Sequence, residues 1–188
     1  MTEYLILAVL WLYAAINCLS AAPFYMKQLI IIRHAKAESG GGQQADFDRV
    51  LSETGKTDAQ SAGLFLKNIL NEKPFVLASP AKRTRQTAEI IAKGLGLDAR
   101  ELHFEPDIYQ AGADKLLSIV RSLPEHVNTA ILVGHNPGVS WLLQLLSGEE
   151  TEKFPPCTIA GLRFQVATWQ LVEEQCGQID CFHLANHH

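Results

Sequence analysis

Residues 29–36 read Leu-Ile-Ile-Ile-Arg-His-Ala-Lys, a run of four aliphatic side chains that ends in a cation and an imidazole. Three of the four aliphatic residues are β-branched, which favours a strand that is buried on both faces, as in the centre of a parallel sheet. In open α/β folds, ligands bind beyond the carboxyl ends of such strands. The run therefore predicts that Arg33 and His34 lie at a functional site.

Two further apolar runs end in polar residues that suit anion binding or proton transfer. Residues 75–78 precede a cation-rich segment that contains Arg83, and residues 130–133 precede Gly-His-Asn-Pro-Gly, which contains His135 and Asn136. A helix is predicted to begin shortly before Arg83, and the free N–H groups of a first helical turn attract phosphate. The alternative interpretation of the cation-rich segment is a solvated basic patch.

Four short motifs follow one another along the chain: Arg33-His34, residues 46–55, residues 79–87 and residues 134–138. In this order they resemble the histidine phosphatase superfamily, and most closely its small SixA-like phosphohistidine phosphatases. The resemblance extends from about residue 26 to the end of the chain. Ala35 departs from the family, which most often has glycine at this position. Alanine is tolerated there unless the position requires a positive φ.

The predicted elements form an α/β fold, a three-layer sandwich with a mostly parallel central sheet, and the resemblance implies that it is phosphoglycerate mutase-like. Alternating residues over 158–172 and 178–184 predict an antiparallel hairpin at the C-terminal edge of the sheet. Helices are expected from Ser52, which resembles an N-cap, to about residue 71, from Pro80 to about residue 94, and over residues 114–123 and 139–146.

Two arginines and two histidines at the ends of strands suit a phosphoryl group, because the planar guanidinium fork matches a pair of phosphate oxygens. A neutral imidazole can act as a nucleophile and form a covalent intermediate. The resemblance implies that His34 is this nucleophile and that Arg33, Arg83 and His135 hold the phosphoryl oxygens. The backbone N–H of Asn136 would add another donor to the phosphate site.

The general acid that would protonate the leaving group is left open by the sequence. Glu105 and Asp107 follow a predicted strand and are candidates by position. The resemblance to the SixA-like branch implies a site without a dedicated general acid. This suits phosphohistidine, because its P–N bond is labile and imidazole is a good leaving group.

The motifs and the short chain favour a metal-independent protein phosphohistidine phosphatase in signal transduction, whose partner is a phosphorylated protein such as a histidine phosphotransfer domain. Little besides the Gly40–Gly42 loop is available to cover the site, and an open site suits a phosphorylated side chain on a protein. The alternative is a small-molecule phosphomonoesterase of the same superfamily. A non-catalytic module that binds phosphoproteins is the third interpretation.

The composition narrows the class of protein further. The 188 residues suit a single domain, and the net charge of −4 gives no reason to expect a nucleic-acid partner. The four cysteines lack the CxxC or Cys/His spacing of a zinc site, and no carboxylate cluster indicates another metal. We therefore expect free thiols, no metal and no cofactor, while the oligomeric state stays open.

Residues 4–26 contain no charged side chain, and three interpretations stay open for the segment before Met26. A signal peptide would fit the small residues 20–22 but lacks a positively charged start, and a membrane anchor would fit the length. The third interpretation, which we favour, is that Met26 starts a cytoplasmic protein. We thus expect a hydrophobic leader over residues 1–25 and a histidine phosphatase domain over residues 26–188, with export or membrane anchoring as the alternative location.

Overall fold

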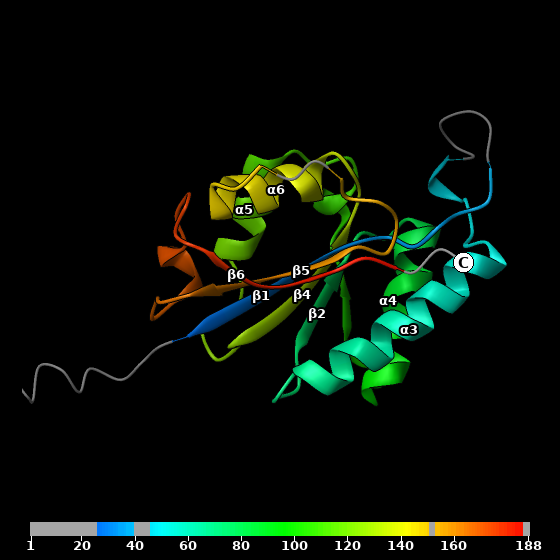
Figure 1. The fold of residues 1–188 in the computed structure, drawn as a ribbon, viewed down its shortest axis with the longest axis horizontal. Coiled ribbons are helices and arrows are strands. Elements are labelled where there is room, and N and C mark those ends of the chain that lie inside the picture. Colours follow the sequence, from blue (N-terminus) through cyan, green and yellow to red (C-terminus); the bar gives the residue numbers. More distant parts are fainter. Residues whose placement is uncertain (1–25, 40–45, 151–152, 186–188) are drawn as a thin grey trace, which may run out of the picture.

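The computed structural model describes residues 26–39, 46–150 and 153–185, which fold around a six-stranded sheet. Its strands are β1 (Lys27–Arg33), β2 (Phe75–Ala78), β3 (Leu102–Phe104), β4 (Thr129–Gly134), β5 (Ile159–Phe164) and β6 (Gln178–His183). Their order across the sheet is β3-β2-β4-β1-β5-β6 (Figure 1). The first four strands in this order are parallel, and β5 and β6 form an antiparallel hairpin. The predicted mostly parallel sheet and its edge hairpin are therefore confirmed.

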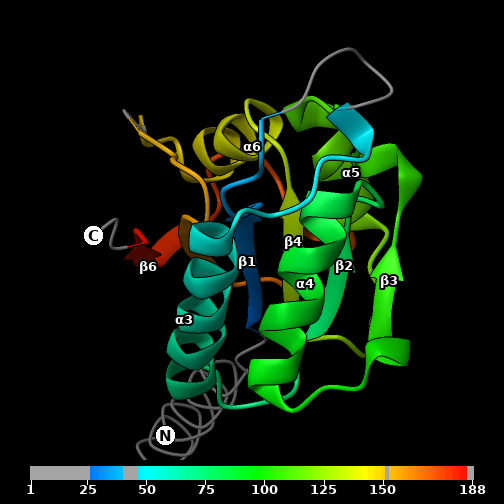
Figure 2. The ribbon, with the colours of Figure 1, turned by 90° about the vertical axis from the view of Figure 1, so that its right-hand side faces the viewer.

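Both faces of the sheet are covered by helices, which are α3 (Glu53–Ile69) and α4 (Lys82–Leu95) on one face and α5 (Ala113–Arg121) and α6 (Gly138–Ser147) on the other (Figure 1). Figure 2 shows α3 and α4 side by side. Leu29 and Ile31 of β1 belong to the core cluster beside α5 and α6. Ile30 and Ile32 belong to the cluster beside α3 and α4. Because successive side chains of β1 enter opposite cores, this strand is buried on both faces, as its aliphatic run predicts.

The first turn of α3 packs closely against the segment that follows β1. Ser52 caps the helix, as predicted, since its Oγ accepts a hydrogen bond from the backbone N–H of Gly55 at 3.1 Å. A Cβ atom at Gly55 would lie 2.0 Å from the carbonyl oxygen of Lys36. The absence of a side chain at this position therefore allows α3 to sit directly beside the chain that leaves His34.

The first arm of the C-terminal hairpin is shorter than the alternating sequence predicts. β5 ends at Phe164 rather than near Val172, and the chain then forms the short 3-10 helix η3 (Trp169–Leu171). The Trp169 indole donates to the Val127 carbonyl at 2.8 Å, and the Arg121 Nε donates to the Val172 carbonyl at 2.7 Å. Trp169 and Val172, which continue the alternating pattern, are thus buried in the core beside α5 instead of pairing in the sheet.

Several expectations concern residues outside the described part of the chain, namely the leader over residues 1–25, the Gly40–Gly42 loop and Cys18. The described cysteines are free, as predicted. No helix among the described residues is long and apolar enough to cross a membrane.

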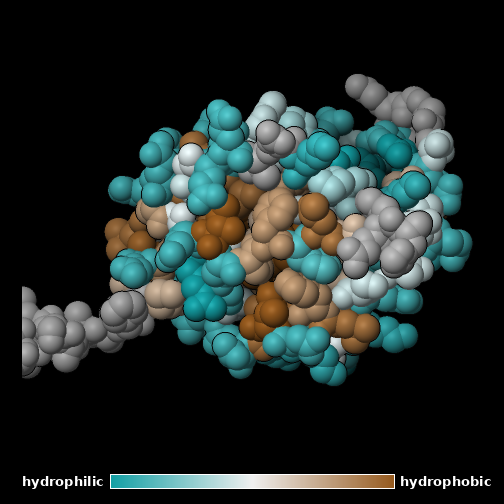
Figure 3. Space-filling view, in the orientation of Figure 1, coloured by the Kyte–Doolittle hydropathy of each residue, from teal (hydrophilic) through white to brown (hydrophobic). Residues whose placement is uncertain are grey.

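Apolar side chains gather along the middle of the face in Figure 3, where β6 forms the edge of the sheet. Phe182 on this strand is 43% exposed.

Candidate active site

Three adjacent strands deliver the predicted site residues to one edge of the sheet. β1, β4 and β2 are parallel neighbours, so their carboxyl ends meet at the same edge. His34 follows β1, His135 follows β4, and Arg83 lies in the first turn of α4, after β2. The His34 backbone N–H donates to the Gly134 carbonyl at 3.0 Å, and the two histidine rings are 5.2 Å apart between centroids. Residues far apart in the sequence thus meet at one site.

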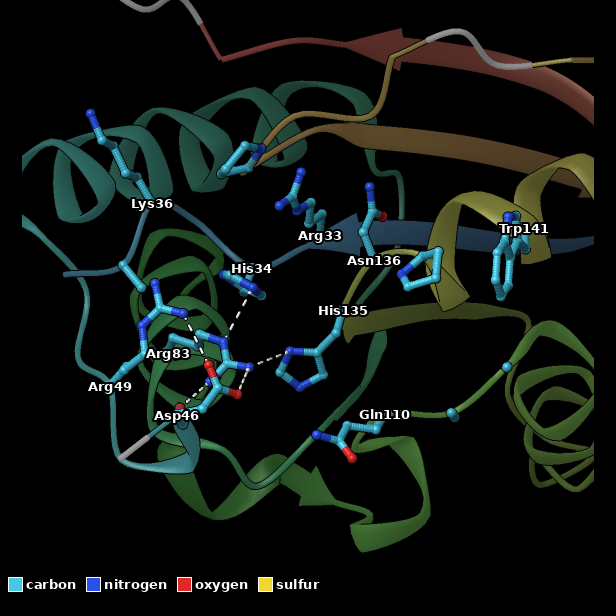
Figure 4. Close-up of a pocket in the computed structure, with 15 residues that line it drawn as sticks. Arg33, His34, Lys36, Asp46, Arg49, Arg83, Gln110, His135, Asn136 and Trp141 are labelled. Atoms are coloured by element: carbon cyan, nitrogen blue, oxygen red, sulfur yellow. Dashed lines mark hydrogen bonds and ion pairs between the residues drawn. The ribbon is translucent and has the colours of Figure 1, made fainter. Parts of the chain in front are cut away.

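A pocket of about 490 Å³ opens at this edge of the sheet (Figure 4). All five residues predicted for the site line it: Arg33, His34, Arg83, His135 and Asn136. Two further cations, Lys36 and Arg49, also line it, whereas the only carboxylate among its described lining residues is that of Asp46. Cations therefore outnumber carboxylates around two imidazoles, which suits an anionic ligand.

The guanidinium of Arg83 connects both histidines. Its Nε donates to His34 Nε2 at 3.2 Å, and its Nη2 donates to His135 Nδ1 at 3.2 Å. Its Nη2 also donates to Asp46 Oδ2 at 2.9 Å, and its Nη1 donates to the Asp46 carbonyl. The side chain is buried, and each of its three nitrogens has a partner in the site. Arg83 is therefore the centre of the hydrogen-bond network.

These contacts determine which nitrogen of His34 carries the proton. Nδ1 lies 2.8 Å from the Ala35 carbonyl oxygen, which can only accept, so the proton is on Nδ1. The lone pair of Nε2 then faces Arg83. Burial, together with the charges of Arg83 and Arg33, lowers the pKa of His34 from 6.5 to about 4, although the hydrogen bond to Ala35 acts in the opposite direction. His34 is therefore neutral at pH 7, with a lone pair inside the pocket.

The second histidine has the opposite tautomer. Arg83 can only donate, so His135 Nδ1 accepts and Nε2 carries the proton. That proton is directed to the hydroxyl of Ser79, whose Oγ lies 2.9 Å from Nε2. Burial and then the neighbouring His34 and Arg83 lower the pKa of His135 to about 3. Ser79 is buried and belongs to the motif over residues 79–87, but the sequence does not indicate its contact with His135.

Asp46 is the main residue that sequence reasoning missed. Besides Arg83, it accepts from Arg49 Nη1 at 2.9 Å and from the Tyr109 hydroxyl at 3.2 Å. Burial alone would raise the pKa of the Asp46 carboxyl, but the hydrogen bonds from Arg49, Arg83 and Tyr109 and the charge of Arg83 outweigh it and lower the pKa. Arg49 lines the pocket together with Asp46. Tyr109 has no motif around it that could have indicated its position.

Arg33 and Asn136 share one backbone acceptor at another side of the pocket. Arg33 Nη1 donates to the Phe154 carbonyl at 2.9 Å, and Asn136 Nδ2 donates to the same oxygen at 3.0 Å. Arg33 Nε is buried without a hydrogen-bond partner among the described residues. A buried donor of this kind is costly unless an acceptor from a ligand reaches it.

Neither candidate acid points into the pocket. The Glu105 carboxylate accepts from the Asp107 backbone N–H at 3.0 Å and caps the short 3-10 helix η2 (Pro106–Ile108). The Asp107 carboxylate pairs with Lys115 at 2.5 Å. Their position after β3 is as predicted, but η2 turns both side chains to other partners.

Ala35 is not among the residues with positive φ, so the departure from the family glycine is tolerated, as expected.

The arrangement offers donors for an anion and, at His34 Nε2, an unprotonated imidazole nitrogen. No three His, Cys, Asp or Glu side chains in the described segments lie close enough together to hold one. Two imidazoles and the guanidinium groups of Arg33, Arg49 and Arg83 at the carboxyl edge of a parallel sheet define an α/β protein with a cationic site that suits an anion such as a phosphoryl group.

Comparisons with known proteins identify the family. The model of the histidine phosphatase superfamily (branch 1) matches residues 29–108. An uncharacterized protein of Mycobacterium tuberculosis is 34% identical over 163 residues, which cover 81% of this chain and 99% of that protein. The chain therefore belongs to the histidine phosphatase superfamily, and to its SixA-like branch.

Two solved structures carry the assignment to this branch. A protein of Nakamurella multipartitia assigned as the phosphohistidine phosphatase SixA is 25% identical, with a TM-score of 0.71 over 86% of this chain and 98% of that chain. A protein of Agrobacterium tumefaciens with the same assignment is 25% identical, with a TM-score of 0.70 over 84% and 97%. Family and fold together support a phosphatase.

Proposed function

We propose that this protein removes the phosphoryl group from phosphohistidine on a partner protein, without a metal ion or cofactor, through a phosphorylated His34. The observation that carries the proposal is the lone pair of His34 Nε2, which faces the pocket because Nδ1 donates to Ala35. The lowered pKa of His34 keeps this lone pair unprotonated at neutral pH. An unprotonated imidazole is the form that can attack phosphorus.

In the first step, His34 Nε2 attacks phosphorus and the P–N bond to the substrate imidazole breaks. The departing imidazole nitrogen takes up a proton from solvent, and the phosphoryl group is now bonded to Nε2. Arg83, whose Nε and Nη2 lie against the two histidines, is placed to neutralise the oxygens of the transferred group. The buried and unpaired Nε of Arg33 supplies another donor, and the backbone N–H of Asn136 a further one.

In the second step, water attacks the phosphorus of phosphorylated His34. The P–N bond breaks, phosphate leaves, and the electron pair returns to Nε2, while the proton of the water passes to the solvent. The hydrogen bond from Nδ1 to Ala35 keeps the ring in the same orientation during both steps. His34 is thus regenerated in the tautomer that begins the next turnover.

The preference for phosphohistidine is supported by the protonation state of the pocket. Asp46 has a lowered pKa, so at neutral pH it is an ionised carboxylate that cannot donate a proton. Glu105 and Asp107 are engaged elsewhere. An alkoxide leaving group needs an acid more than an imidazole does, so this pocket suits a P–N bond better than the P–O bond of a small-molecule phosphomonoester.

A protein substrate is supported by the rim of the pocket. Trp141 on α6 lines the pocket, yet its side chain is 54% exposed, and Figure 4 shows it beyond His135 and Asn136. Exposed tryptophans are uncommon on monomer surfaces and common in the energetic centres of protein interfaces. A histidine phosphotransfer domain is the kind of partner that presents such a phosphorylated side chain.

The test measures phosphate release from a histidine-phosphorylated protein domain and from an aryl phosphate, with the wild type, His34→Ala and the control His103→Ala. His103 stacks on Phe75 and lies outside the pocket. We expect fast release from the protein, little from the aryl ester, background rates for His34→Ala and wild-type rates for His103→Ala. An acid-labile phosphoenzyme should form only when His34 is present.

Each alternative has its own signature in this experiment. Preference for the aryl ester would indicate a small-molecule phosphomonoesterase. Binding of the phosphorylated domain without turnover, unchanged in His34→Ala, would indicate a non-catalytic module. Turnover without any phosphoenzyme would contradict the role of His34.

A further inference from the structure

The guanidinium of Arg83 presents two different edges to its surroundings. Its side edge, formed by Nε and Nη2, faces His34 Nε2 and His135 Nδ1, each at 3.2 Å. Its end edge, formed by Nη1 and Nη2, faces the carbonyl and the carboxylate of Asp46. Figure 4 shows Asp46 beside Arg83 and Arg49, with the histidines on the other side of Arg83. The two edges therefore separate the reacting centre from the carboxylate.

We propose that Asp46 is a positioning residue, which holds the end edge of Arg83 so that its side edge faces the transferred phosphoryl group. The inference rests on the proposed function, because it takes that group to be bonded to His34 Nε2. A phosphoryl group at Nε2 replaces the contact from Arg83 Nε and lies against the side edge. Its oxygens then accept from Nε and Nη2 in the two-pronged geometry that suits guanidinium.

Catalysis benefits if the side edge of Arg83 is already oriented before the phosphoryl group binds. An arginine side chain has many rotamers, and catalysis gains when donors already point to where charge develops. Asp46 restricts Arg83 through two contacts on one edge, one of which joins opposite charges at 2.9 Å. The Arg83 side chain is 7% exposed, so this ion pair is screened less than one on the surface.

Asp46 is itself held in place from two directions. Arg49 Nη1 donates to Oδ1, and the Tyr109 hydroxyl donates to Oδ2. Arg49 in turn donates through Nε to the Glu38 carbonyl at 2.8 Å. These contacts join the segment around Asp46 to the chain that follows β1 and to the loop after η2. The carboxylate is thus built into the wall of the pocket.

A competing interpretation makes the opposite prediction. If Asp46 is an internal anion that competes with the phosphoryl group for Arg83, its neutralisation should strengthen binding of an oxyanion. If it positions Arg83, the same change should weaken binding. Tungstate serves as the probe, since its affinity can be measured without any turnover.

The experiment compares tungstate affinity by calorimetry for the full-length wild type, Asp46→Asn and the control Asp48→Asn. Asp48 lies two residues away and pairs with Lys82 at 3.4 Å outside the pocket. We expect Asp46→Asn to bind tungstate about tenfold more weakly, the range of one charge-assisted contact, and Asp48→Asn to match the wild type. Unchanged or tighter binding by Asp46→Asn would overturn the proposal.

A double-mutant cycle separates positioning from a general structural role. In an Arg83→Gln background, Asp46→Asn should cause little further loss of tungstate affinity, because its effect passes through Arg83. An equal loss in both backgrounds would overturn the proposal. Tyr109→Phe removes one contact to Asp46 without changing any charge, and it should weaken tungstate binding by a smaller factor. If tungstate binding follows these expectations but no phosphohistidine is hydrolysed, the proposed function fails and the positioning of Arg83 stands.

Discussion

The Nε2 atom of His135 lies 2.9 Å from the hydroxyl oxygen of Ser79, a buried side chain directly after β2. In this arrangement the Ser79 hydroxyl accepts a hydrogen bond from Nε2–H, because Nδ1 accepts one from Arg83. A hydroxyl can also donate. When phosphoryl oxygens occupy the side edge of Arg83, Nδ1 of His135 can take up a proton from solvent while Nε2 gives up its own, and the Ser79 hydroxyl can then donate to Nε2. His135 can then donate to the substrate without leaving a buried nitrogen unpaired.

We therefore predict that Ser79→Ala lowers kcat/KM for the phosphorylated protein by about tenfold, the range expected for one buried hydrogen bond. Nitrogen NMR of His135 in the ligand-free variant should still show the Nε2–H tautomer, because Arg83 determines it through Nδ1. The control is Ser122→Ala, since the Ser122 hydroxyl donates to the Ile119 carbonyl on the surface. Unchanged kinetics in Ser79→Ala would contradict a role of Ser79 in the state of His135.

The lowered pKa of His34 predicts the pH dependence of the first step. As the proposed nucleophile, His34 must be neutral, and it becomes protonated only as the pH falls through its pKa of about 4. The rate of phosphoenzyme formation should therefore stay high from pH 7 down to about 5 and fall near pH 4, rather than near the ordinary histidine value of about 6.5. Rapid quench with phosphoramidate, corrected for its uncatalysed hydrolysis, measures this rate. A midpoint near 6.5 would contradict the assignment of a buried, neutral His34.

Exposed Trp141 predicts a difference between large and small substrates. Trp141→Ala should lower kcat/KM for a phosphorylated protein about tenfold more than for phosphoramidate, because only the protein can reach across the rim. Leu64→Ala is a matched control, since Leu64 is an exposed apolar residue on α3 and does not line the pocket. Equal losses on both substrates would place Trp141 in the chemistry rather than in protein recognition.

The close approach of Gly55 to Lys36 predicts that a single added methyl group lowers the unfolding free energy strongly. Gly55→Ala places a Cβ atom against the Lys36 carbonyl oxygen, a backbone atom that cannot move without shifting the segment after His34. We expect a loss of about 3 kcal/mol in unfolding free energy, the upper range for overpacking. Gly112→Ala, where a Cβ would meet nothing within 4 Å, should cost less than about 1 kcal/mol. Urea denaturation measures the unfolding free energy of both variants. Equal values would show that the segment after His34 shifts at little cost to accommodate the Cβ atom.

The parts of the site that the sequence predicts are those with a strong local pattern. The aliphatic run of β1 ends at Arg33 and His34, and the topology of parallel strands brings His135 to the same edge. The strand and the helix that follows it place the segment of Arg83 at the same edge, and the family resemblance selects Arg83 from the cations of that segment. In each case, hydrophobic periodicity locates the element and the element places the side chain.

The remaining parts depend on contacts that no local pattern encodes. Asp46 meets Arg83 across 37 positions and Tyr109 across 63, and neither Asp46 nor Tyr109 lies in a segment with hydrophobic periodicity. Glu105 lies near a strand end, as predicted, yet capping of η2 directs its side chain away from the pocket. Trp169 fits an alternating pattern but is buried beside α5, because burial can be satisfied in a core as well as in a sheet.

The pairing of β1 with β4 has a consequence for how such an enzyme changes its substrate. Six consecutive residue pairs join the two strands, and the bond from His34 to Gly134 extends the pairing up to the proposed nucleophile. The spacing between His34 and His135 is thus determined by the pairing of β1 with β4. Residues 110–112 and Pro156, in contrast, reach the pocket from loops. Evolution or a protein engineer could therefore exchange these rim segments to recognise another partner, while the reactive pair keeps its geometry.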